Sequence, residues 1–229
     1  MSRYLITGAN RGIGLELTRQ ILAQGHQVVA TCRNPGEAGE LNTLTNAGEL
    51  QVVQCDISKP DDIAALVESL HGSTIDVLIN NAGIYGPRDA VLGNLSREPW
   101  REVMEIDLLA PMMLTQALLP FVLAGEGKRI AFLSSKMGSI ADNSSGGSYM
   151  YRTAKAALNQ AIKSLAMDLR EQNIIALSLH PGWVRTEMGG PNGLIDTATS
   201  AAGLLNVIAE AVPSDSGQFI AYDGKRIPW

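Results

Sequence analysis

The sequence of 229 residues is poor in cysteine and histidine, with two and three of them respectively. The histidines, His26, His71 and His180, are far apart, so none forms a cluster with the spacing of a metal site. Cys32 and Cys55 each lie in strand-like apolar sequence, and we interpret them as a reduced structural pair. We therefore predict no metal site and a cytoplasmic location.

The sequence also lacks any run of Lys or Arg, and its formal net charge is −5. This balance argues against a nucleic-acid partner and against binding to an anionic membrane surface. No uninterrupted apolar run approaches the roughly 20 residues that span a bilayer. Met1 and Ser2 are followed by Arg3 and the core-like "YLITG", without the apolar region of a secretory signal. We expect no membrane partner.

No internal repeat, low-complexity tract or linker divides the chain. The main Gly/Ser-rich stretch, 138–149, is too short to separate domains, and it is typical of a loop that leads into a helix. A second stretch of this kind is 189–197. We therefore predict a single domain over residues 1–229.

Short apolar runs alternate with longer amphipathic segments. The runs are near-continuously hydrophobic, as expected for parallel strands covered on both faces. The alternation predicts one doubly wound α/β domain with a seven-stranded parallel sheet and helices on both faces. The expected strands are Tyr4–Ile6, Gln27–Thr31, Leu50–Gln54, Val77–Ile79, Ile130–Leu133, Ala176–Leu179 and Gln218–Ala221, and the expected helices are roughly 12–24, 61–70, 100–124, 151–171 and 197–211.

A glycine-rich loop follows the first strand and opens the first helix. Gly8, Gly12 and Gly14 have the spacing G-x-x-x-G-x-G. Such a loop turns tightly, lets the backbone approach a pyrophosphate, and presents free N–H groups at the helix N-terminus. We interpret it as a dinucleotide-binding loop of a Rossmann fold; the alternative is an ordinary glycine-rich turn.

The second strand carries a signal about the cofactor. In many Rossmann proteins an acidic residue near its end binds the ribose hydroxyls of NAD. Cys32 occupies that position here, Arg33 follows it, and Arg11 lies in the glycine loop. Two guanidinium groups suit a 2′-phosphate, so we favour NADP over NAD; the alternative is two solvated surface arginines.

The stretch "GGSYMYRTAK" (146–155) holds two tyrosines in a segment that we expect to enter a helix. Tyr151 has Lys155 four residues on, whereas Tyr149 has Thr153 at that spacing. Only the first pair places a phenol and an ammonium on one helix face, one turn apart. We therefore expect Tyr151 to carry the chemistry.

Six short motifs occur in the order and at the separations of one family: "TGANRGIG", "CDI" (55–57), "NNAG" (80–83), "SS" (134–135), "YRTAK" (151–155) and "HPG" (180–182). Through these motifs the chain, from Tyr4 to about Asp223, resembles the short-chain dehydrogenase/reductases. Each motif alone is weak, but six in register are specific. Within this family "HPGWVRTEMGG" and the ending "SGQFIAYDGKRIPW" are similar to sniffer-type carbonyl reductases and bacterial C-factor signalling proteins.

The resemblance implies a role for each matching residue. Ser135 would face the substrate carbonyl, Tyr151 would be the acid/base, and Lys155 would be its partner, while Ser134 would be structural. We choose Ser135 because the active serine of the family is followed by x-x-Gly, here Gly138. The implied cofactor-binding residues are Gly8, Asn10, Arg11, Gly12, Ile13, Gly14, Arg33, Asp56, Ile57, Asn81, Ala82, Gly83, Tyr151, Lys155, Pro181, Gly182, Val184 and Thr186.

These residue types suit carbonyl reduction. A free tyrosine, with a pKa of about 10, transfers protons poorly at neutral pH. An ammonium group one helical turn away stabilises the phenolate, so we expect Lys155 to lower the pKa of Tyr151. Ser135 can donate a hydrogen bond to the oxygen on which negative charge develops.

One position departs from the family pattern. Many members have an Asn on the helix after the "NNAG" strand, and the matching residue here is Asp107. If only its backbone carbonyl matters, Asp serves equally well; if its side chain matters, the added charge raises the pKa of Lys155 and Tyr151. We keep Asp107 as a candidate catalytic residue.

The loops after the fourth and sixth strands are expected to line the substrate pocket, with a substrate loop near 185–197. Ile84, Tyr85, Trp183 and Met188 would make this pocket apolar; core packing or a subunit contact explains them equally well. The short loop after Thr186 suggests an open site and a small or permissive carbonyl substrate.

We therefore expect an NADP-dependent oxidoreductase that reduces an aldehyde or ketone to an alcohol. The competing interpretation, from the C-factor resemblance, is a dinucleotide-binding signalling or regulatory protein with little turnover. A purely structural homo-oligomer is disfavoured by the polar centre and the glycine loop. The unusually apolar helix near 100–124 favours a homodimer that packs through it; a well-buried helix is the alternative.

Overall fold

The computed structural model of the protein describes residues 1–44 and 49–229. Its strands form one parallel sheet in the order β3-β2-β1-β4-β5-β6-β7, which confirms the predicted α/β fold. Each strand lies within about one residue of its expected bounds. The strands are β1 (Arg3–Thr7), β2 (Gln27–Cys32), β3 (Leu50–Gln54), β4 (Val77–Asn80), β5 (Arg129–Leu133), β6 (Ile175–His180) and β7 (Phe219–Ala221).

Neighbouring residues of the central strands enter different cores, because successive side chains point to opposite faces of a sheet. Leu5 packs on one face and Ile6 on the other. Leu78 and Ile79 of β4 divide in the same way, and all four side chains are fully buried. This explains why the strands read as continuous apolar runs rather than as alternating ones.

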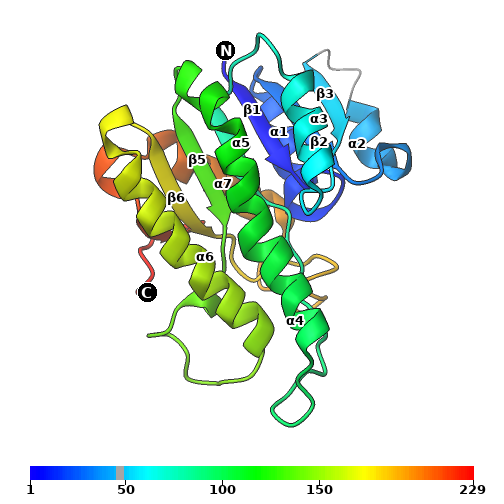
Figure 1. Ribbon diagram of the computed structural model, residues 1–229, viewed down its shortest axis with the longest axis vertical. Coiled ribbons are helices and arrows are strands. Elements are labelled where there is room, and N and C mark those ends of the chain that lie inside the picture. The colour runs from blue at the N-terminus through cyan, green and yellow to red at the C-terminus, as the bar shows by residue number, and fades with distance from the viewer. Residues whose placement is uncertain (45–48) are drawn as a thin grey trace.

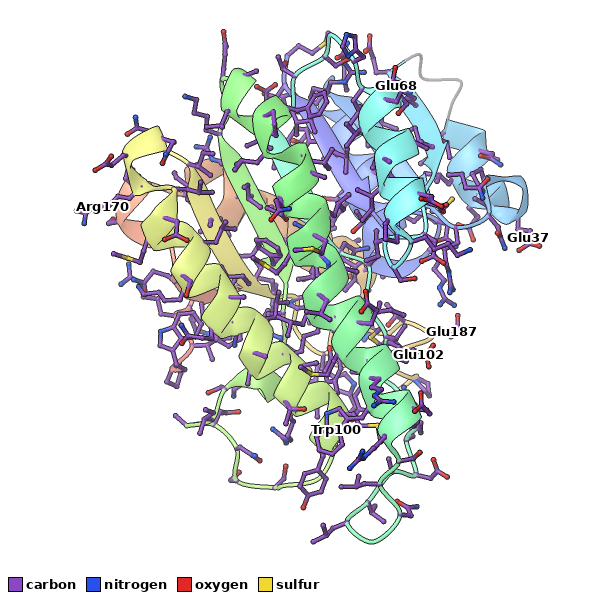
Figure 2. The ribbon with its side chains drawn as sticks, in the orientation of Figure 1. Glu37, Glu68, Trp100, Glu102, Arg170 and Glu187 are labelled. Atoms are coloured by element: carbon purple, nitrogen blue, oxygen red, sulfur yellow. The ribbon has the colours of Figure 1, made fainter. Side chains whose placement is uncertain are left out.

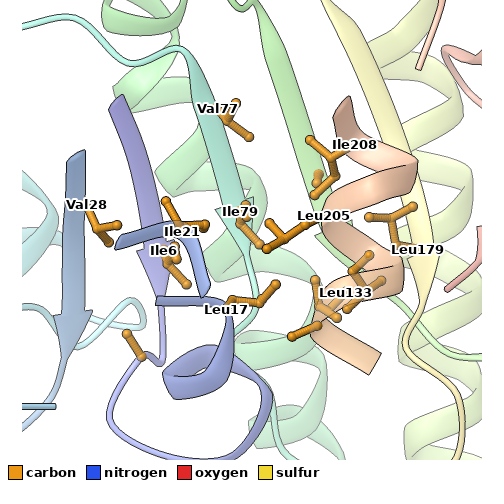
Figure 3. Packing of buried hydrophobic residues seen from close by; sticks show 14 of the residues in the cluster. Ile6, Leu17, Ile21, Val28, Val77, Ile79, Leu133, Leu179, Leu205 and Ile208 are labelled. Carbon is orange, nitrogen blue, oxygen red and sulfur yellow. The ribbon is translucent and has the colours of Figure 1, made fainter. Parts of the chain in front are cut away.

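Helices α1 (Gly12–Ala23) and α7 (Thr197–Glu210) cover one face of the sheet. Figure 3 shows Leu17 and Ile21 of α1 and Leu205 of α7 directed at the apolar side chains of the strands. A short helix, α2 (Gly39–Thr43), adds Leu41 to the same core. The sequence did not predict α2, since five residues are too few for a helical period to be visible.

Helices α3 (Pro60–Ser69), α5 (Ala110–Ala124) and α6 (Tyr149–Asp168) cover the other face. In Figure 1 the α4–α5 rod and α6 run side by side in front of the strands. Charged side chains at the periphery, such as those of Glu37, Glu68 and Arg170, point outward (Figure 2).

The expected helix 100–124 begins earlier and is not uniform. It starts as α4 (Arg97–Met104), passes through a π-helical turn (Glu105–Leu109) and continues as α5. By length and composition, Arg97–Ala124 is the one helix in the described chain that could cross a membrane. Core helices of soluble proteins pass the same test, and Leu114 and Leu118 of this stretch are fully buried against the sheet.

Candidate active site

The predicted site residues lie at the carboxyl ends of the strands. The strand order reverses between β1 and β4, and open α/β sheets bind ligands at this point. The glycine loop follows β1 and the "NNAG" segment follows β4, so the two flank the reversal. The fold therefore brings the two ends of the predicted cofactor site together from segments about 70 residues apart.

Two glycines of the first loop are required by geometry. Gly8 has a φ of +64°, and a Cβ there would lie 3.0 Å from the Cα of Ala82. A Cβ on Gly14 would lie 2.3 Å from the carbonyl oxygen of Gly8 and 2.5 Å from the side-chain nitrogen of Asn81. Any side chain would therefore push the loop away from the segment after β4.

Asn81 joins the two segments across the crevice. Its side-chain amide donates to the carbonyl oxygens of Thr7 (2.8 Å) and Gly8 (3.0 Å). The backbone N–H groups of Asn81 and Ala82 in turn donate to the Thr7 hydroxyl, both at 3.0 Å. The predicted residue Asn81 thus holds the shape of the glycine loop, a role that the sequence did not suggest.

The N-terminus of α1 fits an anionic group. No side chain caps it, and its first turn contains no acidic residue. The first N–H groups of a helix without such acceptors, together with the helix dipole, favour a phosphate. The residues present therefore fit a dinucleotide, with the glycine loop and the start of α1 at its pyrophosphate.

Basic groups lie near the end of β2, where the sequence analysis expects the adenosine of the cofactor. Cys32 is the buried last residue of β2, and the exposed Arg33 follows it. Arg33 lies close enough to Asp56 to act on its charge: burial raises the pKa of Asp56, but hydrogen bonds from Ser58 and the nearby cations outweigh it and lower the pKa. Arg11 forms an ion pair with Glu187 of the β6–α7 loop. A 2′-phosphate bound by Arg11 would therefore share the guanidinium with the Glu187 carboxylate.

The other predicted cofactor residues fall in the same set of loops. They follow β1, β3, β4 and β6 at the carboxyl ends of the strands. They are Asn10, Gly12 and Ile13 after β1, Ile57 after β3, Gly83 after β4, and Pro181, Gly182, Val184 and Thr186 after β6.

The structure brings Ser135, Tyr151 and Lys155 together. Ser135 follows β5, Tyr151 lies in the first turn of α6, and the Ser135 side chain is close enough to Tyr151 to lower the pKa of its phenol in part. Lys155 Nζ lies 5.6 Å from the centre of the Tyr151 ring and donates to the carbonyl oxygen of Leu133 (3.0 Å). All three catalytic candidates are at least nine-tenths buried.

The adjacent Ser134 has a structural role, as the resemblance implied. Its hydroxyl donates to Asn159 Oδ1 (2.6 Å), which also accepts from Ser178 (2.7 Å), and all three residues are buried. Gly138 explains the x-x-Gly pattern, because a Cβ there would lie 2.8 Å from the carbonyl carbon of Lys155. The turn after Ser135 therefore packs directly on α6.

The expectation that Lys155 lowers the pKa of Tyr151 was wrong for this structure, whereas the alternative, that the charge of Asp107 raises it, agrees with the structure. The pKa of Tyr151 lies well above its usual value, because burial and the charge of Asp107 outweigh the lowering effect of the Ser135 side chain. The ammonium of Lys155 is directed at the Leu133 carbonyl and paired with Asp107 instead. Tyr151 is thus a protonated phenol at neutral pH.

Asp107 lies in the π-helical turn between α4 and α5 and is fully buried. Its Oδ1 accepts from the backbone N–H of Ile84 (2.8 Å), and its Oδ2 lies 3.6 Å from Lys155 Nζ, beyond hydrogen-bond distance. Burial raises the pKa of Asp107, and the charge of Lys155 opposes that rise only in part. A Cβ on Gly83 would lie 2.9 Å from Asp107 Oδ1, so only glycine leaves room here.

Two contacts across the site were not predicted. The guanidinium of Arg88, in the β4–α4 loop, donates to the carbonyl of Met188 in the β6–α7 loop. The rings of Tyr85 and Tyr151 lie 4.7 Å apart, centre to centre. No sequence signal could have revealed either contact, since each joins residues more than 60 positions apart.

The β6–α7 loop spans 181–196 and closes on itself. Trp183 donates its indole N–H to the carbonyl of Gly189 (2.8 Å), while half of the Trp183 surface stays exposed.

A cavity of 470 Å³ beside this loop is lined by Lys136, His180, Trp183 and residues 221–223 and 225–228, among others, but not by the catalytic candidates. Among the described residues no group of His, Cys, Asp and Glu could hold a metal ion.

The fold and this site define a dinucleotide-binding α/β oxidoreductase. The family described as "short chain dehydrogenase" matches residues 3–194, and the chain belongs to that family. C-signal of Myxococcus xanthus is 43% identical over 155 residues, which cover 68% of this chain and 93% of that protein.

Two solved structures extend the likeness over the whole chain. The carbonyl reductase Sniffer of D. melanogaster has a TM-score of 0.95 and 36% identity, with all of both chains covered. The NADPH-bound carbonyl reductase from chicken fatty liver has a TM-score of 0.91 and 35% identity, covering 100% of this chain and 99% of that one. The family assignment and the resemblance to sniffer and C-factor proteins are thereby confirmed.

Proposed function

We propose that the protein is an NADP-dependent carbonyl reductase that converts an aldehyde or ketone to an alcohol. The observation that carries this proposal is the buried Ser135–Tyr151–Lys155 centre beside a glycine loop shaped for a dinucleotide. Whole-chain similarity to carbonyl reductases, one of them with bound NADPH, supports it. Arg11 and Arg33 support the choice of NADP.

In this proposal the cofactor supplies the hydride to the carbonyl carbon when it is bound. Ser135 donates a hydrogen bond to the carbonyl oxygen and so polarises it. Tyr151 gives its phenolic proton to the same oxygen as the alkoxide forms. The raised pKa of Tyr151 keeps the phenol protonated at neutral pH, which is the form that reduction needs.

Lys155 and Asp107 support Tyr151 and do not themselves donate to the substrate carbonyl. The Leu133 carbonyl and Asp107 hold the ammonium of Lys155 in place, 5.6 Å from the centre of the Tyr151 ring. The backbone N–H of Ile84 fixes Asp107 from the other side. This arrangement fixes the surroundings of the acid.

A C-signal-like role is the second candidate, and the 43% identity to C-signal favours it. In that case the protein binds the dinucleotide as a signalling or regulatory component with little turnover. The buried polar centre argues for turnover, because burying Lys155 with Asp107 is costly for a module that only binds.

We also propose that the protein forms a homodimer through α5. Large apolar side chains are exposed along one stripe of this helix and of the π-helical turn before it: half of Leu109 in the turn and half of Met113 in α5 are uncovered, and Leu123 of α5 is also exposed. Their spacing of four and then ten residues keeps them on one helix face. A second copy of the chain would cover this stripe with an identical one.

Nucleotide binding and turnover test the proposed function directly. NADPH and NADH are titrated by fluorescence, and oxidation of NADPH is then followed with small aldehydes, ketones and diketones. We expect tighter binding of NADPH than of NADH, a smaller difference in Arg33→Ala, and turnover of at least one carbonyl class. Binding without turnover across the panel would favour the C-signal-like role, and failure to bind either nucleotide would contradict both.

A further inference from the structure

Tyr85 packs against the catalytic phenol from a different part of the chain. It lies five residues after β4, in the loop that leads to α4, whereas Tyr151 is on α6. Their ring centres are 4.7 Å apart with an interplanar angle of 33°. This distance is within the range in which aromatic pairs attract one another beyond simple burial.

Tyr85 is also fixed to the start of α6. Its hydroxyl forms a 2.8 Å hydrogen bond with the side chain of Ser148, the residue just before the helix. Ser148 has a φ of +47°, and its carbonyl accepts from the N–H of Arg152 (2.9 Å), so the turn that carries Ser148 is itself held by the helix. Tyr85 therefore moves together with the helix that carries Tyr151.

The guanidinium of Arg88 lies over the Tyr85 ring. The guanidinium carbon lies 4.9 Å from the ring centre, a cation–π distance, and the guanidinium is bound to the Met188 carbonyl. Lys155 lies 5.6 Å from the ring centre of Tyr151. These pairwise contacts connect Lys155, Tyr151, Tyr85 and Arg88 in that order, and we refer to the four side chains as the column.

We propose that Tyr85 is a positioning residue for Tyr151, and that Arg88, anchored on the β6–α7 loop, holds Tyr85 in place. The proposal rests on the proposed carbonyl reduction. For proton transfer the phenol must point at the substrate oxygen beside Ser135, and small misplacements of a reacting group are costly in rate. Lys155 alone limits the Tyr151 ring incompletely, because it contributes a single ammonium rather than a packed surface.

The column also links the catalytic acid to the substrate loop. The Arg88 guanidinium donates to the Met188 carbonyl, so the β6–α7 loop is tied to the same set of contacts as Tyr85 and Tyr151. Loss of the column should slow the chemical step and leave nucleotide binding unchanged.

Two Tyr85 variants test this. Tyr85→Leu removes the ring, whereas Tyr85→Phe keeps the ring and loses only the bond to Ser148. We expect kcat for reduction to fall about tenfold in Tyr85→Leu and at most about threefold in Tyr85→Phe, as for the loss of one aromatic pair. NADPH affinity should stay unchanged, and the isotope effect with deuterated NADPH should grow because hydride and proton transfer become limiting.

Tyr149→Leu is the matched control, because Tyr149 begins the same helix and has no ring partner among the described residues. It should keep the wild-type kcat. Arg88→Met, at an exposed position, tests the outer end of the column and should lower kcat by about threefold. It also keeps the proposal testable if Tyr85→Leu fails to fold.

A measurement without turnover completes the test. In nuclear magnetic resonance spectra of tyrosine-labelled protein, the Tyr151 ring is assigned by its loss in Tyr151→Phe. Its resonance should shift in Tyr85→Leu and in Arg88→Met and stay in place in Tyr149→Leu. An unshifted resonance with an unchanged kcat would overturn the proposal. A wild-type protein that binds NADPH but reduces no carbonyl would instead contradict the proposed function.

Discussion

At the scale of single residues, burial and the charge of Asp107 together raise the pKa of Tyr151. The carboxylate of Asp107 faces Lys155 at 3.6 Å. The Ser135 side chain lowers the pKa of Tyr151 but does not compensate. Reduction needs the protonated phenol as acid, whereas oxidation of an alcohol needs the phenolate as base.

Asp107→Asn should be at least as active as the wild type in reduction. The amide can still accept from Ile84, and the charge that raises the pKa of Tyr151 is gone. A lower pKa yields phenolate at lower pH, so the rising limb of the oxidation rate should move to lower pH. The measurement is the pH dependence of kcat in both directions.

Glu105→Gln, in the same π-helical turn, is the control for a change of charge nearby and should leave the profile in place. A large loss of reduction in Asp107→Asn, with NADPH affinity intact, would show that the carboxylate itself takes part in proton transfer. That outcome would contradict our account of this residue.

At the scale of elements, the chain is tied together where β4 begins. The carboxylate of Asp76 accepts backbone N–H groups of Arg3 (2.7 Å), Glu126 (2.9 Å) and Gly127 (3.1 Å). It thereby joins the start of β1 to the turn between α5 and β5. Burial raises the pKa of Asp76, but the three hydrogen bonds outweigh it, so the pKa lies below its usual value.

Asp76→Asn should destabilise the fold by about 1–3 kcal/mol at neutral pH, as expected when charged acceptors are lost. Because the folded pKa of Asp76 is lowered, its contribution is complete above the unfolded value of about 3.9 and is lost as the pH falls through the folded value. The difference between wild type and variant should therefore vanish in acid. Denaturant unfolding measured from neutral to acidic pH checks this.

Glu68→Gln is the matched control, because Glu68 is exposed on α3 and points outward (Figure 2). It should change stability by no more than about 0.5 kcal/mol at any pH. If Asp76→Asn stays less stable than the wild type by the same amount in strong acid, the carboxylate charge does not explain its contribution.

Most elements of the fold could be predicted from the sequence, because parallel strands buried on both faces leave unbroken apolar runs. The glycine spacing and the Tyr151–Lys155 pair are local patterns and could be read directly. The π-helical turn at Asp107 could not be predicted, and the sequence left open whether Lys155 or Asp107 decides the direction of the Tyr151 pKa. Both depend on which groups the folded chain buries together, and the spacing of residues along the sequence does not reveal this.

At the scale of the whole molecule, the exposed apolar stripe of α5 predicts a dimer in solution. Met113→Glu places a charge in the middle of the stripe and should convert the dimer to a monomer, because a buried unpaired charge is costly. Sedimentation of the purified protein measures this. Val212→Glu, a similarly exposed apolar site outside the helix, should leave the dimer intact.

A wild-type protein that sediments as a monomer would contradict the proposed dimer. The stripe would then need another explanation, such as contact with a lipid surface, and Met113→Glu would lower binding to vesicles in that case. The proposed catalytic centre does not depend on the outcome, since Ser135, Tyr151 and Lys155 all lie within one chain.

The central claim is that Tyr151 supplies the proton for carbonyl reduction. The most direct test compares NADPH binding and NADPH oxidation in the wild type and in Tyr151→Phe, with the same carbonyl substrate. Our account predicts equal NADPH affinity and a loss of turnover of at least about 100-fold in the variant, as for the removal of a general acid. Turnover within a few-fold of the wild type, at equal affinity, would contradict it.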